Sequence, residues 1–229
     1  MPTLTPLEIE ALSLSLKVGL WSALTSLPIA IAVAVILGRT HFPGKSLVDT
    51  LVYLPLVLPP VVTGYFLLVL FGRRGPIGGP LEHWFGLVFA FRWTGAALAS
   101  AVMGFPLMVR AIRLSVEAID PGLEQAAATL GAGRIAVFVT VTLPLMLPGI
   151  IAGTLLGFAR SLGEFGATIT FVSNIPGETR TLPIAIYGLT QVPGGDAAVL
   201  RLVLLSVAVS IGALLASELL ARRIARTTA

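Results

Sequence analysis

The chain has 229 residues, of which 56% are hydrophobic and 11% are charged, and its mean hydropathy is +0.97. A soluble domain carries roughly a quarter charged residues, so this balance excludes an ordinary soluble domain and predicts an integral membrane protein with about five to seven spans of roughly 20 residues. The net charge is +4, and no run of Lys and Arg is interleaved with aromatic residues, which excludes a nucleic-acid-binding surface. The absence of Cys excludes disulfides and thiolate metal sites.

Two apolar runs open the chain. The first, Leu20–Leu37, is predicted to be a membrane span. The second continues through Phe71 and contains Pro55, Pro59 and Pro60. Proline removes a backbone hydrogen bond, and free carbonyls at membrane depth need neighbouring protein or water. This segment is therefore predicted to be broken or kinked and to face the protein interior, the alternative being a proline kink that serves packing alone.

A loop and an aromatic segment precede the next span. The Gly/Pro-rich loop covers Gly72–Gly79, and a short interfacial helix is predicted over Leu81–Phe91. The third span is predicted over Thr94–Ile112, interrupted by Gly104 and Pro106. Five aromatic residues are expected to form a belt at one membrane interface: Trp84, Phe85, Phe89, Phe91 and Trp93.

A stretch of polar and small residues then predicts a short amphipathic helix. Pro121 after Asp120 gives a start signal, and Gly131 supplies a stop. Glu124 lies in the first turn, where the helix dipole favours an anion. A second short helix is expected to begin near Ile135. Two short helices that meet at a glycine corner on the membrane surface would form a protruding surface to which a soluble partner could bind. The alternative is that this stretch is only a solvated loop between helices.

The fourth span is predicted from Pro148 to about Phe171 and contains two opposite charges. Arg160 and Glu164 are four residues apart, which places them on one helix face. A lone charge at the bilayer centre costs about 2.5–3.5 kcal/mol on insertion scales, so the pair should face protein or water. Ser161 and Thr168 add hydroxyls that can donate to an oxyanion. The pair is either a structural ion pair or a gate or pathway position.

The last part of the chain is predicted to hold one more span. Ile175–Gly195 is a polar connection in which a short helix is predicted over Pro183–Thr190, and the fifth span is predicted over about Val199–Leu220. Five spans place the two termini on opposite sides of the membrane. His41 and His83 are expected in loops on opposite sides, where they cannot share a metal, so an intramembrane enzyme is not expected.

The spacing of the central stretch resembles the cytoplasmic loop signature of permease subunits of binding-protein-dependent ABC importers. That family usually has Glu directly before two Ala, whereas this chain has Gln125 there and Glu124 one place earlier. The departure argues against any role that needs a charge at position 125. It does not affect the coupling role that the resemblance implies for the loop. The matching positions are Ala126, Ala127, Gly131, Val141, Leu143 and Pro144.

Further runs are similar to the molybdate permease branch of this family, whose close relatives carry sulfate or tungstate. The resemblance extends from about Ser13 to Glu218. The runs that carry it are Phe42–Lys45, Leu54–Val62, Met108–Arg113, Ser161–Phe171 and Ser173–Thr181.

The resemblance implies an all-α integral membrane protein with the type I ABC importer permease fold, about five transmembrane helices and a cytoplasmic coupling helix. It implies a single permease domain over residues 1–229, with the coupling loop at about 114–134. The implied ATPase-coupling residues are Glu124, Gln125, Ala126, Ala127 and Gly131. The pathway or gate candidates are Arg160, Ser161, Glu164, Thr168, Pro59 and Pro60.

The function implied is ATP-driven import of molybdate across the bacterial inner membrane. The chain has no Gly-x-x-x-x-Gly-Lys-[Ser/Thr] motif, so the energy must come from another polypeptide. The implied partners are a second copy of the chain, two cytoplasmic ATP-binding subunits, a periplasmic oxyanion-binding protein and membrane lipid, with no cofactor, metal or nucleic acid. The N-terminus is expected outside and the C-terminus in the cytoplasm. A sulfate/thiosulfate or tungstate permease, a passive anion channel and a secondary carrier are the alternatives.

Overall fold

The structure is a computed structural model that describes residues 5–227, with side chains described through residue 215. The described part of the chain is helical and contains no strand. Four of its helices are long and apolar enough to cross a membrane, and a bent helix pair gives a fifth span. The prediction of an all-α membrane protein with about five spans is therefore confirmed.

The first helix, α1 (Pro6–Arg39), begins fourteen residues before the predicted start of the first span. Its start is fixed by a capping box in which Thr5 and Glu8 bond each other's backbone N–H groups. Glu8 also forms an ion pair of 2.9 Å with Arg201 of the last helix, so the amino-terminal turn is packed into the fold. The apolar run alone did not predict these turns because they lie outside it.

The proline-rich second span is broken, as predicted. Helices α2 (Lys45–Val57) and α3 (Pro60–Phe71) meet at an angle of 113°. The break falls at Pro59, because neither Pro59 nor Pro60 has an N–H to continue the hydrogen bonding of α2. The prediction that this segment faces the protein interior is wrong for α2, which has no buried residue in the single chain.

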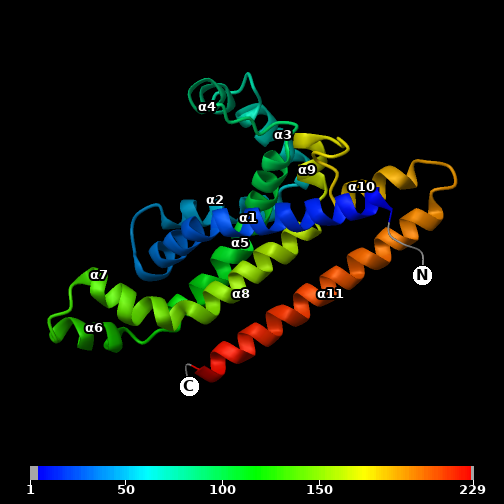
Figure 1. Ribbon diagram of the computed structural model, residues 1–229. Coiled ribbons are helices and arrows are strands. Elements are labelled where there is room, and N and C mark those ends of the chain that lie inside the picture. Colours follow the sequence, from blue (N-terminus) through cyan, green and yellow to red (C-terminus); the bar gives the residue numbers. More distant parts are fainter. Residues whose placement is uncertain (1–4, 228–229) are drawn as a thin grey trace.

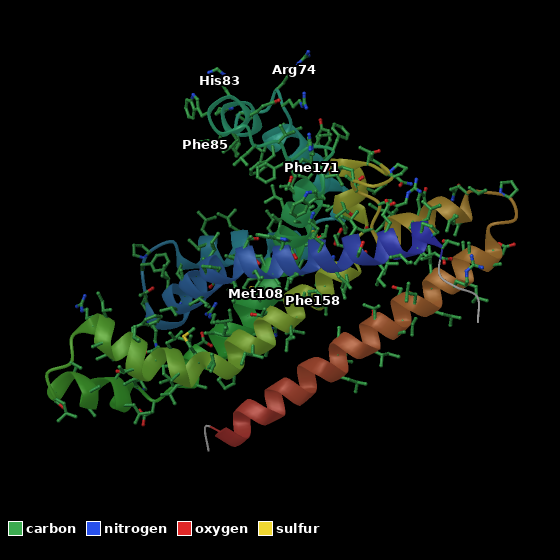
Figure 2. The ribbon with its side chains drawn as sticks, in the orientation of Figure 1. Arg74, His83, Phe85, Met108, Phe158 and Phe171 are labelled. Carbon is green, nitrogen blue, oxygen red and sulfur yellow. The ribbon has the colours of Figure 1, made fainter. Side chains whose placement is uncertain are left out.

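Helix α4 (Gly78–Phe85) is shorter than the predicted interfacial helix and lies on a corner that projects from the rest of the molecule (Figure 1). His83 belongs to this helix and not to a loop, and its side chain lies on the projecting corner with those of Arg74 and Phe85 (Figure 2). The predicted aromatic belt is split. Trp84, Phe85 and Phe91 are exposed, whereas Phe89 and Trp93 pack against a buried cluster.

Helix α5 (Trp93–Glu117) forms the centre of the fold and packs against both α1 and α8. It is continuous through Gly104 and Pro106, so the predicted interruption does not occur. Membrane helices tolerate proline where neighbouring helices enclose the freed backbone groups, and Pro106 is buried here. Met108 of α5 lies close to Phe158 of α8 in this core (Figure 2).

After α5 come α6 (Pro121–Thr129), α7 (Arg134–Val137), the π-helical turn η1 (Phe138–Thr142) and α8 (Leu143–Leu162). Residues Arg134–Leu162 form one span, so the predicted start at Pro148 is too late and the predicted end at Phe171 too late as well. Helicity passes Pro144 and Pro148, and it stops at Gly163, before α9 (Gly166–Val172).

The last two helices are α10 (Leu182–Thr190) and α11 (Asp196–Thr227). The first confirms the predicted short helix to within one residue, and the second is longer than the predicted fifth span at both ends. Helix α11 contacts α8 and α10 but runs along one side of the molecule (Figure 1). Only 6% of the most apolar window of Asp196–Leu215 is buried, so most of the surface of this described part is free to meet lipid or another chain.

Candidate functional site

Helices α6 and α7, the latter at the start of the fourth span, lie together at one end of the molecule (Figure 1). The sequence places α6 there by local signals. Asp120 is its N-cap and accepts a 2.8 Å hydrogen bond from the Gly122 N–H, and Pro121 occupies the first helical position. Gly131 then takes a left-handed φ of 88°, which turns the chain into α7. The short helix and glycine corner are as predicted.

The outer surface of this helix pair carries both polar and apolar side chains and is not buried against the described part of the chain. Neither α6 nor α7 has a buried residue. Gln125, Ala126 and Gly131 are exposed and Ala127 is partly exposed. Leu130 lies outside the candidate spans and is 89% exposed, which is unusual for a large aliphatic side chain there, and Ile135, at the start of the fourth span, is 82% exposed. An exposed apolar patch rimmed by polar residues is typical of a protein interaction site.

Glu124 points inward from α6 and ties it to two other elements. Its Oε1 accepts a hydrogen bond from Arg39 at the end of α1 (3.0 Å) and another from the Thr142 hydroxyl in η1 (2.7 Å). The Glu124 and Arg39 side chains are 26% and 22% exposed, and Thr142 is buried. We call Arg39, Glu124 and Thr142 the clamp. It holds α6 to the end of α1 and to η1.

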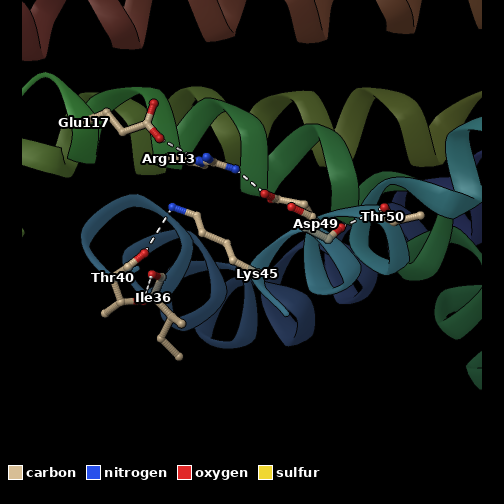
Figure 3. Close-up of polar contacts among 8 residues, drawn as sticks. Ile36, Thr40, Lys45, Asp49, Thr50, Arg113 and Glu117 are labelled. Carbon is tan, nitrogen blue, oxygen red and sulfur yellow. Dashed lines mark hydrogen bonds and ion pairs between the residues drawn. The ribbon is translucent and has the colours of Figure 1, made fainter. Parts of the chain in front are cut away.

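A second charged cluster lies where α1, α2 and α5 meet. Arg113 of α5 forms ion pairs of 2.7 Å with Asp49 of α2 and with Glu117 one turn further along α5. Lys45 donates to the Thr40 carbonyl at the end of α1 (Figure 3). These contacts hold the start of α2, which has little other packing, against α5.

The two helix breaks of the fold lie against each other. Helices α3 and α9 pack side by side, and a Cβ on Gly166 would lie only 2.7 Å from the Pro60 Cβ. Pro59, on the other side of the break, is exposed. The break at Pro59 and Pro60 therefore meets the break that follows Gly163. Chain interruptions inside a span occur where neighbouring protein or a water-filled cavity encloses them.

Arg160 and Glu164 form the expected ion pair, with 2.7 Å between Nη1 and Oε2. The pair does not lie on one continuous helix face, because α8 ends at Leu162 and Glu164 sits in the break. Glu164 is 1% exposed and its Oε1 accepts a hydrogen bond from the Ala167 N–H at the start of α9. Arg160 is 28% exposed, so it is the member of the pair that reaches the surface of the single chain.

The two predicted hydroxyls are both buried. The Ser161 hydroxyl lies 2.6 Å from that of Ser22 on α1, and Thr168 donates to the Phe165 carbonyl. Within one copy of the chain, these groups and Glu164 join α8, α9 and α1, while Arg160 and Pro59 remain accessible. Among the residues whose side chains are described, no group of three or more His, Asp or Glu could hold a metal.

Sequence reasoning missed Arg39 and Thr142 as members of the site. Arg39 lies two residues beyond the predicted first span, and Thr142 lies between the matching positions Val141 and Leu143; neither was assigned a role. The signal available was a lone carboxylate, Glu124, one place away from its usual position. Its two partners are 85 and 18 residues distant, so spacing along the chain could not identify them.

A family model described as "Binding-protein-dependent transport system inner membrane component" matches residues 28–226. The "Molybdenum transport system permease protein ModB" of Escherichia coli (strain K12) is 64% identical to this chain over 219 residues, which is 96% of each protein. The protein of that name from Haemophilus influenzae is 60% identical over 217 residues, which is 95% of each.

Solved structures show the same fold at low sequence identity. A bacterial alginate ABC transporter in complex with an alginate pentasaccharide-bound periplasmic protein has a chain that superposes with a TM-score of 0.75 at 20% identity. The superposition covers 96% of this chain and 80% of that one.

Proposed function

The chain belongs to the family of inner membrane components of binding-protein-dependent transport systems, and from that premise we propose that it is the permease subunit of an ATP-driven molybdate importer. The observation that carries this proposal is its identity of 64% and 60%, over nearly the whole length, with permease proteins of molybdenum transport systems. The chain is a multi-pass inner membrane protein of an ABC transporter, and its helices provide the spans.

Energy is supplied by a separate pair of ATP-binding subunits. The sequence has no P-loop motif of its own, and α6 and α7 expose an apolar patch at one end of the spans. We assign Gln125, Ala126, Ala127 and Gly131 to the surface that meets an ATP-binding subunit. Glu124 is assigned a different task, since its carboxylate is engaged by Arg39 and Thr142 and transmits movement of α6 to two spans.

The translocation pathway is formed between two copies of the chain. One copy with about five spans is small for an enclosed passage, and closed twofold dimers are the commonest assemblies of identical chains. The candidates that remain accessible in one copy are Arg160, Pro59 and the partly exposed Pro60. The buried residues Ser161, Glu164 and Thr168 stabilise the segment that carries these candidates by joining α8, α9 and α1. Arg160 then offers a guanidinium toward an oxyanion while Glu164 holds it in place.

Transport proceeds by alternating access. A periplasmic binding protein delivers molybdate to the outer mouth, and ATP draws the two ATP-binding subunits together beneath α6. The ligand that shifts the equilibrium must bind the two states differently, and that difference comes from ATP. In this arrangement α6 and the C-terminus face the cytoplasm and the N-terminus lies outside, and cargo specificity resides mainly in the binding protein.

The test is uptake of labelled molybdate into proteoliposomes that hold this chain with the ATP-binding subunit and the binding protein of the same transporter. We expect uptake that needs ATP, resists excess sulfate and is lost in Gly131→Asp, whose side chain is strained at a φ of 88°. A matched control is Gly133→Asp, at a nearby exposed glycine with a φ of −69°. Uptake without ATP would identify a carrier or channel, and uptake abolished by sulfate would identify a sulfate permease.

A further inference from the structure

A large apolar cavity lies between α1, α2, α5 and the loop that precedes α5. Its volume is about 770 Å³, within the range of roughly 300–1,000 Å³ that is typical of sites for small organic ligands. Its wall includes large side chains from all of these elements: Trp21, Ile29, Leu51, Phe89, Trp93 and Phe105. Neither the clamp nor the pathway candidates line it, so the proposed transport role gives it no task.

The wall of the cavity offers nothing to an oxyanion. Among the residues whose side chains the structure describes, no charged one lines the cavity, and the three hydroxyls in the lining belong to Thr25, Ser26 and Thr94. Each of these hydroxyls donates to a backbone carbonyl of its own helix or of the adjoining loop, at 2.6–3.1 Å. Donors already used in this way are not available to molybdate. The chemistry of the cavity therefore suits a hydrocarbon chain.

The depth of the cavity equals about one leaflet of a membrane. Along α1 its lining runs from Trp21 to Ile29, which is eight residues or about 12 Å of helix. Along α5 it runs from Trp93 to Phe105, which is twelve residues or about 18 Å. Half of a hydrocarbon core of about 30 Å is about 15 Å. The cavity thus reaches from the level of the tryptophans to the bilayer midplane.

Lys17 places a positive charge against Trp93, one of the residues that line the cavity. Lys17 lies one turn before Trp21 on α1, and its Nζ is 3.7 Å from the centroid of the Trp93 ring. Lys17 is exposed and forms no ion pair with the described side chains, and the next 21 residues of α1 are uncharged. Tryptophan and the last charge before an apolar run mark the headgroup level of a bilayer. A cation at that level complements an anionic headgroup, and the apolar cavity next to it complements the acyl chain of the same lipid.

We propose that this cavity binds one acyl chain of an anionic phospholipid, with the phosphate of its headgroup against Lys17. The acyl chain lies between α1 and α5 and contacts α2 at Val48, Leu51 and Pro55. Helix α2 has no buried residue in the protein alone, so the bound chain supplies packing that α2 otherwise lacks. The lipid is thus a structural part of the wall beside the broken span.

Native mass spectrometry of the permease with its ATP-binding subunit, titrated with phosphatidylglycerol or with phosphatidylcholine of the same chain length, tests this site. We expect one retained phosphatidylglycerol per copy of the chain and an about fivefold preference over phosphatidylcholine, as one basic residue at a membrane surface provides. Lys17→Gln should abolish the preference, whereas Lys45→Gln, at a lysine that bonds a carbonyl elsewhere, should retain it. Ala101→Phe should fill the cavity and remove both lipids, whereas Leu204→Phe on exposed α11 should remove neither.

Three outcomes would overturn the proposal. The first is full lipid retention in Ala101→Phe, and the second is an unchanged preference in Lys17→Gln. The third is capture of a second copy of the chain, instead of lipid, by a crosslinker on Ala101→Cys, which is unambiguous because the chain has no natural Cys. If Ala101→Phe does not fold, Lys17→Gln still tests the proposal, because it changes only an exposed side chain. The measurement needs neither ATP nor molybdate, so its result is independent of the transport assay.

Discussion

Replacing Glu124 with Ala removes the acceptor on which the clamp depends. In the structure one carboxylate oxygen receives both the Arg39 guanidinium at 3.0 Å and the Thr142 hydroxyl at 2.7 Å. The substitution leaves both donors without that partner and leaves the exposed face of α6 unchanged. It therefore separates attachment of the coupling helix to the spans from recognition of the ATP-binding subunit.

The size of the effect follows from the burial of the pair. A hydrogen bond to a charged group is worth about 1.5–3 kcal/mol, and a fully exposed ion pair about 0.2–1 kcal/mol. The Arg39 and Glu124 side chains are 22% and 26% exposed, which places the clamp between these cases. We expect Glu124→Ala to weaken the attachment of α6 to the spans by about 1–3 kcal/mol. This changes the equilibrium between attached and detached α6 by about 5–150-fold.

The assay is simultaneous measurement of molybdate uptake and ATP hydrolysis in proteoliposomes. Glu124→Ala should lower the molybdate carried per ATP at least fivefold while hydrolysis and subunit assembly persist. Glu124→Gln should have a smaller effect, because its amide oxygen still accepts from Thr142. The exchanged pair Arg39→Glu with Glu124→Arg should recover part of the ratio. Glu117→Ala is the matched control, since it removes a carboxylate from Arg113, which keeps Asp49.

Two results would refute this reasoning. A wild-type ratio in Glu124→Ala, with the complex intact, would mean that α6 is attached to the spans by other contacts. Loss of the ATP-binding subunit from the purified Glu124→Ala complex would mean that the carboxylate contacts the partner and not Arg39 and Thr142.

Three further substitutions test the corner and the breaks. Gly131→Ala should cost about 1–2 kcal/mol at its left-handed φ and lower molybdate uptake, measured against ATP hydrolysis. Glu164→Ala should leave the Arg160 charge and a backbone N–H without their acceptor, with a loss of about 1–3 kcal/mol and a lower Tm by tryptophan fluorescence. An unchanged Tm would contradict a structural role. Gly166→Val should also lower the Tm, because its side chain would meet the Pro60 ring at the crossing of α3 and α9, and a wild-type Tm would show that the breaks can separate.

The sequence predicted those features that depend on local chemistry or on hydrophobic composition. Composition predicted the helical membrane fold, and the proline run predicted the break between α2 and α3. Helix α10 was located to within one residue because Pro183 marks its first turn and a Gly-containing loop follows. The short helix α6 follows from Asp120, Pro121 and the glycine corner.

Features that depend on tertiary contacts were not predicted. Helix α1 starts early because Glu8 finds both a cap partner and Arg201, which is 193 residues away. The fourth span ends at Leu162 because Glu164 turns to cap α9. Hydropathy along the sequence reveals neither of these contacts. The clamp shares this origin, since Glu124 was identified from its loop while its two partners come from other helices.

Helix α1 is longer than a membrane is thick. Its 34 residues extend about 51 Å, whereas a bilayer with its headgroups measures about 40–45 Å. One end is bonded to α11 through Glu8 and Arg201, and the other to α6 through Arg39 and Glu124. A continuous helix fixed at both ends acts as a strut between the two aqueous phases. In the proposed mechanism a displacement of α6 would be transmitted along α1 to the opposite membrane surface, and Pro28, where the helix lacks one hydrogen bond, is the position at which α1 would bend.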